Sequence, residues 1–450
     1  MKLNFGCTIN KSGFDGGVNY DEVLTFSLIE EQIKSGVFDS DKDMLGWLKL
    51  PFTQQSELDK IKDFGKFVND NFENFVVFGI GGSALGAIAV YNAVGKQKSK
   101  LGFYVLDNVD PDEFSEVINK IDITKTMFNI ITKSGSTVET LTQMSVIIKL
   151  LTKAGCDYTK HLVVTTEEGN SLCEYAKNNN IPHFSLARDV GGRFSVLSSV
   201  GLLPMAVMGI DIFSVLKGAK DMLEKAKQNS LTENAPLMSA VINFILAKEG
   251  KEEIVVMPYS YKLKTMSDFY LQLLGESLGK KNKCDGSENP LTITPIKAVG
   301  VTDQHSQMQL YFEGRNNKTF CFIGQESFDN EFFSSPLDIA SYNDNRPQTM
   351  GQLLNVERQA TMFALYNNNK PCYLITIDEV DEYAVGELIM YFELVTAFMG
   401  ELMEINAYNQ PGVEAGKINT KALLNNKKFR QEKENLLIVR EECDKFIINS

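Results

Sequence analysis

The sequence predicts an α/β protein with two parallel-sheet domains, and three observations support this class. Short apolar runs alternate with longer amphipathic segments from about residue 73, which is typical of βαβ units. The alternation resumes near residue 253, after a mostly helical stretch. The chain also has 450 residues, enough for two or three domains of about 100–200 residues each.

The pattern in the first half of the sequence predicts one domain, which lies between an N-terminal arm and a helical connection. The arm covers residues 1–70, the first domain residues 71–210 and the connection residues 211–250. Within the domain, apolar runs predict strands at 74–80, 102–107, 127–132 and 161–166. The segments that follow these runs predict helices at 83–94, 140–151 and 171–179.

The second half predicts a similar domain at residues 251–403, followed by a helical C-terminal segment at 404–450. Its strands are expected at 253–260, 293–300, 319–324 and 372–377. Its helices are expected at 266–278 and 386–403. Polar stretches at 325–348 and 425–436 predict solvated loops.

Composition and charge exclude several classes of protein. Asp and Glu number 58 against 45 Lys and Arg, a net charge of −13 that disfavours nucleic acid and anionic membranes as partners. The longest nearly apolar stretch, 200–210, is too short to span a bilayer, and the first residues lack a signal-peptide pattern. Seven scattered cysteines without a CxxC motif favour reduced thiols in the cytoplasm. Three histidines without HxH or HxxxH spacing predict no histidine-based metal site.

A glycine loop, Gly-Ile-Gly-Gly-Ser-Ala-Leu-Gly at 79–86, follows the first predicted strand. Loops beyond the carboxyl ends of parallel strands bind ligands. The glycines let the backbone approach an anion or a sugar, and Ser83 is placed to cap the next helix. The glycine spacing and Asp107 also fit a dinucleotide fingerprint, and an ordinary tight turn is a third interpretation.

A hydroxyl loop, Thr-Lys-Ser-Gly-Ser-Thr-Val-Glu-Thr at 132–140, ends the third strand and opens a helix. Ser136 and Glu139 fit a capping box, so an ordinary capped helix is one interpretation. One cap needs only one or two hydroxyls, however. The full cluster therefore favours a phosphate site at the positive end of the helix.

Two charged residues lie in segments that suit catalysis. Arg193 follows two glycines, which suits stabilisation of a developing oxyanion, although a surface arginine in a turn has the same pattern. Gln272 and Glu276 share one face of an apolar helix. A sheltered carboxylate there suits a general base, and a helix-end glutamate capped by Gly279 is the alternative.

Two further segments complete the set of candidates. His305 lies in a polar loop at 302–307, flanked by hydrogen-bonding residues. A loop-to-helix junction at 410–417 ends in Lys417 and is uninformative taken alone.

Together, six ordered segments resemble the glucose-6-phosphate isomerase (phosphoglucose isomerase) family in its short bacterial form. They read GIGGSALG, TKSGSTVET, DVGGRFSVLSSVGLLP, LLGESLGK, VTDQHSQMQL and QPGVEAGK, between residues 79 and 417. The resemblance implies two doubly wound sugar-isomerase (SIS) domains, a homodimer with a shared active site, and no cofactor. The first 70 and last 30 residues contribute little to it.

The resemblance also implies a role for each matching position. The residues implied to bind substrate are Gly82, Ser83, Thr132, Lys133, Ser134, Thr137, Gln272 and Gln410, with the phosphate at the hydroxyl loop. The residues implied in catalysis are Arg193 for the enediolate, Glu276 as the base, and His305 with Lys417 for ring opening. In the family the histidine comes from the partner subunit.

The implied enzyme is an aldose–ketose isomerase of glycolysis and gluconeogenesis. It interconverts glucose 6-phosphate and fructose 6-phosphate through a cis-enediol, so one carboxylate serves both carbons. Three alternatives stay open: a non-catalytic sugar-phosphate sensor with the same domains, an NAD-dependent oxidoreductase that uses the glycine loop, and a related isomerase that also accepts mannose 6-phosphate.

Overall fold

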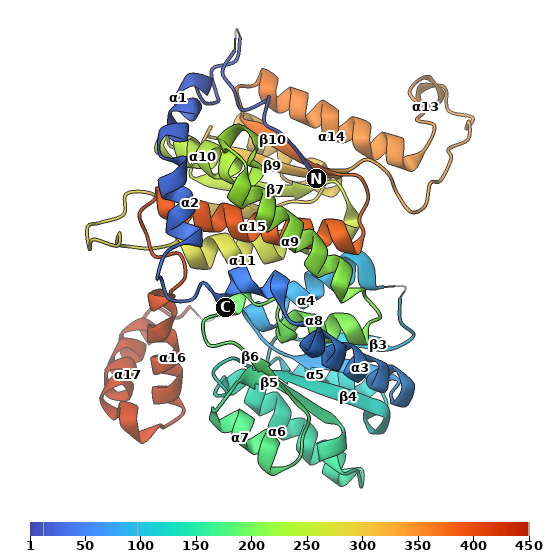
Figure 1. Ribbon diagram of the computed structural model, residues 1–450, viewed down its shortest axis with the longest axis vertical. Helices are drawn as coiled ribbons and strands as arrows, with labels where there is room; N and C mark the ends of the chain where they lie inside the picture. The colour runs from blue at the N-terminus through green and yellow to red at the C-terminus, as the bar shows by residue number, and fades with distance from the viewer. Residues whose placement is uncertain (12, 97, 449–450) are drawn as a thin grey trace. The chain divides into compact units, whose positions relative to one another are not determined.

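The computed structural model describes residues 1–11, 13–96 and 98–448 (Figure 1). The chain forms two compact units, Met1–Ala407 and Tyr408–Ser450. The five-part division expected from the sequence, with boundaries at residues 71, 211, 251 and 404, stays a prediction.

Five parallel strands form the first sheet of the larger unit, in the order β3-β2-β4-β5-β6. They are β2 (Asn74–Phe78), β3 (Gly102–Leu106), β4 (Thr126–Ile131), β5 (Leu162–Glu167) and β6 (His183–Leu186). The four predicted strands are confirmed. The sequence analysis missed β6, because it is a four-residue edge strand with mostly half-exposed side chains.

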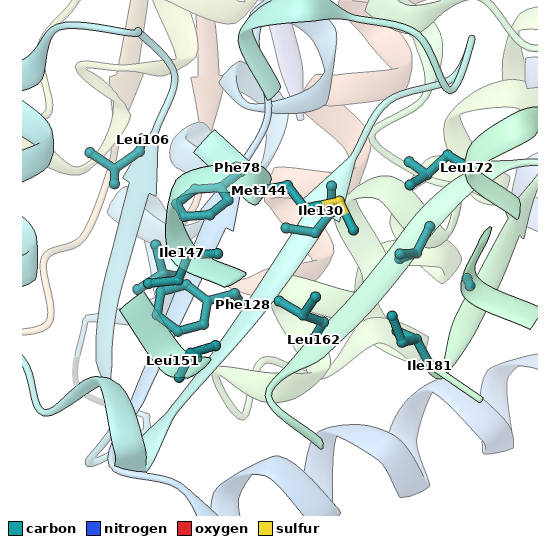
Figure 2. Packing of buried hydrophobic residues seen from close by; sticks show 13 residues of the cluster. Phe78, Leu106, Phe128, Ile130, Met144, Ile147, Leu151, Leu162, Leu172 and Ile181 are labelled. Atoms are coloured by element: carbon teal, nitrogen blue, oxygen red, sulfur yellow. The ribbon is translucent and has the colours of Figure 1, made fainter. Parts of the chain in front are cut away.

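Helices cover both faces of the first sheet, which makes it doubly wound. On one face lie α5 (Pro111–Lys120), α6 (Val138–Lys153) and α7 (Ser171–Asn178); on the other lie α3 (Gln55–Asn71), α4 (Leu85–Val90) and α8 (Ser199–Val207) (Figure 1). Figure 2 shows Phe78, Phe128 and Ile130 from the strands packed with Met144 and Leu172 from the helices. Burial on both faces explains why the strands are apolar without alternation.

The second sheet has the order β1-β10-β9-β7-β8. Its strands are β1 (Lys2–Asn4), β7 (Glu253–Pro258), β8 (Thr294–Lys297), β9 (Lys318–Gln325) and β10 (Cys372–Ile377). The four predicted strands run parallel, and β1 adds an antiparallel edge beside β10. A three-residue edge strand with exposed ends gives no periodic signal, so β1 was not predicted.

Helix α15 (Glu382–Leu402) is the central helix of the larger unit and confirms the helix expected at 386–403. It packs against α9 (Ile212–Gln228), α10 (Ala235–Lys248) and α11 (Met266–Leu278). By length and composition α15 passes the test for a membrane span, but 94% of its apolar window is buried inside the protein, as expected for a core helix.

The remaining helices are shorter or more exposed. They are α1 (Tyr20–Thr25), α2 (Glu30–Phe38), α12 (Met308–Glu313), α13 (Ala340–Asp344), α14 (Met350–Asn367), α16 (Glu414–Leu423) and α17 (Arg430–Asp444). The solvated loop expected at 425–436 is wrong in its second half, because α17 begins at Arg430. That helix has no buried residue, and it gains support from pairs such as Arg430 with Glu434.

The helix expected at 83–94 is interrupted. It consists of a 3-10 turn, η3 (Gly81–Ser83), then α4, then a π-helical turn, η4 (Tyr91–Gly95). The predicted cap is also wrong: Ala84 occupies the N-cap of α4, because Ser83 belongs to the preceding turn.

A fully buried carboxyl group lies within α15. Neither oxygen of Glu393 has a hydrogen-bond partner among the described residues. Burial raises the pKa of Glu393 well above its usual value of 4.5, so the folded chain holds this carboxyl in its neutral form. An unpaired polar group in the core lowers stability.

Replacing this carboxyl by a thioether should stabilise the protein. Glu393→Met should raise the free energy of unfolding by about 1–3 kcal/mol at neutral pH, since it removes an unsatisfied buried group of similar volume. The gain should increase as the pH rises above 4.5, because the unfolded chain then loses the proton that folded Glu393 retains. Urea unfolding at acidic and neutral pH measures both effects.

Glu387 on the same helix provides the matched control. Its carboxylate pairs with the N-terminal ammonium at 3.1 Å and with Lys225 at 3.3 Å. Glu387→Met should therefore lower stability. A loss of stability in Glu393→Met as well would show that the buried carboxyl has a partner that stabilises it.

Candidate active site

The glycine loop and the hydroxyl loop leave neighbouring strands of the first sheet. Phe78 of β2 pairs with Ile130 of β4, so the two loops begin side by side. The strand order reverses between β2 and β4, and this reversal is the point where open parallel sheets bind ligands.

The glycine loop packs tightly against the segment that carries Arg193. A Cβ atom on Gly82 would lie 2.2 Å from the carbonyl oxygen of Gly192, so only glycine fits there. Gly81 has φ +57°, and a Cβ atom there would lie 3.1 Å from Nε2 of Gln272. These contacts place the glycine loop beside both Arg193 and the helix that carries Glu276.

Arg193 is buried at the centre of this arrangement, with a side chain only 1% exposed. Its Nε donates to Oγ of Ser277 at 2.6 Å, its Nη2 donates to the carbonyl oxygen of Ala407, and its Nη1 lies 3.4 Å from Oε2 of Glu276. The alternative of a surface arginine is therefore wrong. The hydrogen bonds fix the guanidinium plane, as a buried charge requires.

Glu276 lies in the last turn of α11, with its side chain 31% exposed. Gln272 donates from Nε2 to Oε1 of Glu276 at 2.8 Å, which confirms that the two share a face. Gly279 does occupy the C-cap, but the carboxylate is engaged by two neighbours rather than fully solvated. The carboxylate is thus held in place while part of it faces solvent.

The hydroxyl loop keeps its side chains together at the N-terminus of α6. The hydroxyls of Thr132 and Thr137 lie 2.6 Å apart, and Ser136 donates to Oγ of Ser134 at 3.1 Å. The expected capping box is wrong: Thr137 is the N-cap, and its hydroxyl makes no cap bond to the helix, because it pairs with Thr132. Hydroxyls and helix N–H groups are therefore gathered at one helix N-terminus, an arrangement that suits an anion.

Lys133 does not extend into this hydroxyl cluster. Its Nζ donates to the carbonyl oxygens of Arg188 and Val190, both at 2.8 Å. Burial lowers the pKa of Lys133. The side chain thus joins the hydroxyl loop to the segment that leads into Arg193.

Asn170 supports the hydroxyl loop from behind and was missed by the sequence analysis. Its Nδ2 donates to the carbonyl oxygen of Lys133 at 3.0 Å, while its Oδ1 accepts from the first N–H groups of α7. Ser171 donates to the carbonyl oxygen of Gly135 at 3.4 Å. An asparagine directly before a predicted helix is an N-cap signal, so the capping role of Asn170 could be predicted from the sequence. Its hydrogen bond to the Lys133 carbonyl could not.

His305 ends a 3-10 turn, η10 (Thr302–His305), and is exposed. Its ring makes no hydrogen bond within the described part of the larger unit. Gln410 and Lys417 belong to the smaller unit, where Lys417 pairs with Glu414 at 2.9 Å on α16. Their expected approach to Glu276 stays a prediction.

The fold and these loops define a class: an α/β protein with a glycine loop and a hydroxyl loop side by side at the switch point of a parallel sheet. The phosphoglucose isomerase family model matches residues 56–436. The chain therefore belongs to the phosphoglucose isomerase family. This membership does not favour the dinucleotide and sensor hypotheses.

Individual relatives agree with the family model. The chain is 40% identical over 448 residues to a glucose-6-phosphate isomerase of Carboxydothermus hydrogenoformans, covering 96% of this chain and 95% of the relative. A hypothetical protein from Thermus thermophilus has a similar crystal structure, with a TM-score of 0.86, 33% identity and coverage of 94% and 100%. A glucose-6-phosphate isomerase from Chlamydia trachomatis shares the fold, with a TM-score of 0.81, 23% identity and coverage of 93% and 88%.

Lys280 is a second site-adjacent residue that the sequence analysis missed. Its Nζ donates to the carbonyl oxygens of Glu276 and Ser277 at the end of α11. Burial, reinforced by the nearby Arg193 charge, lowers the pKa of Lys280 from 10.5 to about 8.

This shift predicts a pH-dependent contribution to stability. From about pH 8 to 10.5 the unfolded chain keeps the Lys280 proton that the folded chain loses. The free energy of unfolding should therefore rise with pH in this window relative to the Lys280→Met variant. Urea unfolding of both proteins across the window checks this, with exposed Lys281→Met as control. If the free energy of unfolding varied with pH in the same way for wild type and Lys280→Met, the lowered pKa of Lys280 would be contradicted.

Proposed function

We propose that this chain is an aldose–ketose isomerase that interconverts glucose 6-phosphate and fructose 6-phosphate through a cis-enediol. The observation that carries the proposal is the pair of Glu276 and Arg193, with Nη1 and Oε2 3.4 Å apart beside the glycine loop. A carboxylate and a guanidinium so placed supply a base and a counter-charge for an enediolate. Family membership supports the same reaction.

The substrate phosphate would bind at the hydroxyl loop. Thr132, Ser134 and Thr137 offer hydroxyls at the N-terminus of α6, and its dipole favours negative charge there. The adjacent turn η3 adds the hydroxyl of half-buried Ser83. Lys133 would act indirectly by holding the loop, since its ammonium is bound to backbone carbonyls.

The sugar carbons would lie between the phosphate and Glu276. Gly82 lets the chain pass close to the sugar, and Gln272 orients the carboxylate through its 2.8 Å hydrogen bond. Glu276 removes the proton from C2 of the aldose, and the electron pair moves onto the carbonyl oxygen. The proton of the C2 hydroxyl passes to the oxygen on C1, so that C2 becomes the carbonyl carbon when the same carboxyl returns its proton to C1. Arg193 balances the negative charge on oxygen in between.

Ring opening would need a second protomer. His305 is exposed on the surface of its own chain, which suits a role in the site of a partner. The segment after β9 also exposes large apolar side chains, each more than half exposed, that a homodimer would bury: Phe332, Phe333, Leu337, Ile339 and Met350. Lys417 would assist at the sugar hydroxyl, with Gln410 near the phosphate.

The remaining features of the proposal follow from composition. A surplus of acidic residues, −13 in net charge, disfavours nucleic acid and anionic membranes as partners. Scattered cysteines without CxxC motifs suit the cytoplasm. The binding partners are then a sugar phosphate and a second copy of the chain.

The reaction itself is tested with chelator-treated protein and fructose 6-phosphate in deuterated water. Glucose 6-phosphate should form, detected by a coupled dehydrogenase, with solvent deuterium at C2. If glucose 6-phosphate formed without any deuterium from the solvent, the reaction would proceed by a hydride shift and not by proton transfer through Glu276. Absence of product would overturn the proposal.

Glu276→Gln should reduce kcat by at least about 10²–10⁴-fold, because the base for both proton transfers is lost. Affinity for the sugar phosphate, measured by calorimetry, should change little since the phosphate binds elsewhere. Exposed Glu313→Gln is the control and should keep full activity. Near-normal turnover of Glu276→Gln would refute the assignment of the base.

The shared site is tested by mixing two inactive variants. His305→Ala alone should lose most activity on cyclic substrate, whereas Gln309→Ala nearby should not. In a heterodimer of His305→Ala with Glu276→Gln, one of the two shared sites contains both intact residues. Co-expression should therefore restore about a quarter of wild-type activity in a random mixture of dimers. No recovery beyond the sum of the separate variants would place both residues in one protomer.

A further inference from the structure

Three side chains of the types that bind metals meet beside β5 and β6, at one edge of the first sheet. Glu168 follows β5, Cys173 lies in α7 and His183 opens β6. A ligand atom from each lies within 4.8 Å of the other two. Their spacings in the sequence match no metal motif, which is why sequence analysis expected no metal site. The parallel pairing of β5 with β6 brings them together.

The three donors suit zinc. Thiolate, imidazole and carboxylate are its usual protein ligands, and a site with three of them keeps a fourth position for water. Oε2 of Glu168 lies 3.5 Å from Sγ of Cys173. Two ligands at about 2.3 and 2.0 Å from a tetrahedral ion are separated by about the same distance. Cys173 is buried whereas Glu168 is exposed, so the position opens to solvent on one side.

Neighbouring groups orient the carboxylate. Ser185 donates to Oε2 of Glu168 at 3.0 Å, and Lys177 binds the other oxygen, Oε1. The backbone N–H of Cys173 donates to Oδ1 of Asn170 at 2.9 Å and so fixes the first turn of α7. Hydrogen bonds from groups that do not themselves bind the metal hold its ligands in position.

We propose that Glu168, Cys173 and His183 form a zinc-binding site, with water as the fourth ligand. Zinc binding displaces the thiol proton to solvent and leaves Sγ as thiolate. The ion would join β6 and α7 to the loop at 168–170, which contains Asn170. Because Asn170 holds the carbonyl of Lys133, occupancy also stiffens the hydroxyl loop. This second consequence rests on the proposed function, whereas metal binding does not.

Binding is tested on the full chain after chelator treatment and reduction of the thiols. Titration with Zn²⁺ against a chromophoric chelator should give one tight site per chain. Co²⁺ in its place should give a thiolate charge-transfer band and the strong visible bands of tetrahedral cobalt. Cys173→Ser and His183→Gln should each weaken zinc binding at least tenfold and remove or shift these bands. Cys156→Ala and His161→Gln, outside the cluster, are the matched controls.

Glu168→Gln is an exposed substitution that keeps the test valid if buried Cys173 variants fold poorly. This substitution should also weaken zinc binding at least tenfold. The melting temperature of the metal-free variant should differ from that of metal-free wild type only by the small effect of losing the surface ion pair with Lys177. Equal zinc affinity and equal cobalt spectra in wild type, His183→Gln and Glu168→Gln would overturn the site. Failure of wild type to bind zinc at micromolar metal would do the same.

The link to the hydroxyl loop has a separate readout. Zinc should change KM for fructose 6-phosphate in wild type and leave KM of Glu168→Gln unchanged. If the chain lacks isomerase activity, the cobalt spectra still decide whether the metal site exists. Tight zinc binding with no change in KM would remove the link while leaving the site in place.

Discussion

The buried guanidinium of Arg193 is the constraint on which the rest of the site depends. A permanent positive charge with a side chain 1% exposed is stable only where hydrogen-bond acceptors surround it. Its partners come from segments far apart in the chain, Glu276 with Ser277 on α11 and the carbonyl of Ala407. Satisfying this one group therefore joins the first sheet to the helix that carries the carboxylate.

The close approach of backbones makes that arrangement possible. Gly82 lies against the Gly192 carbonyl with no room for a Cβ atom, so Arg193 emerges directly beside the glycine loop. A larger residue at position 82 would separate the two loops and move the guanidinium away from Glu276. The glycines thus act through packing between two loops, in addition to freeing backbone for a ligand.

Strands and long helices were predictable because burial on both faces leaves a clear apolar run, as in β2 and β4. The short edge strands β1 and β6 were not, since pairing with a neighbour rather than periodicity creates them. The motif residues of the site were identifiable by type and position. Their orientation was not: Lys133 points to carbonyls, and Thr137 rather than Ser136 occupies the N-cap of α6, with its hydroxyl turned to Thr132. Contacts such as these depend on segments distant in sequence.

An anion site in a chain of net charge −13 has to work without a surplus of cations. The hydroxyl loop, which we propose as the phosphate site, would meet this condition with neutral donors. Thr132 and Thr137 bond to each other, so a phosphate bound there as proposed would exchange one neutral hydrogen bond for a charge-assisted one. Asn170 and Ser171 hold the loop through its backbone carbonyls, and Lys133 links it to the segment before Arg193. Little ordering cost would therefore remain at binding. Selectivity would then come from pre-organised geometry and the dipole of α6, both short-ranged, while the acidic surface would repel anions only at longer range.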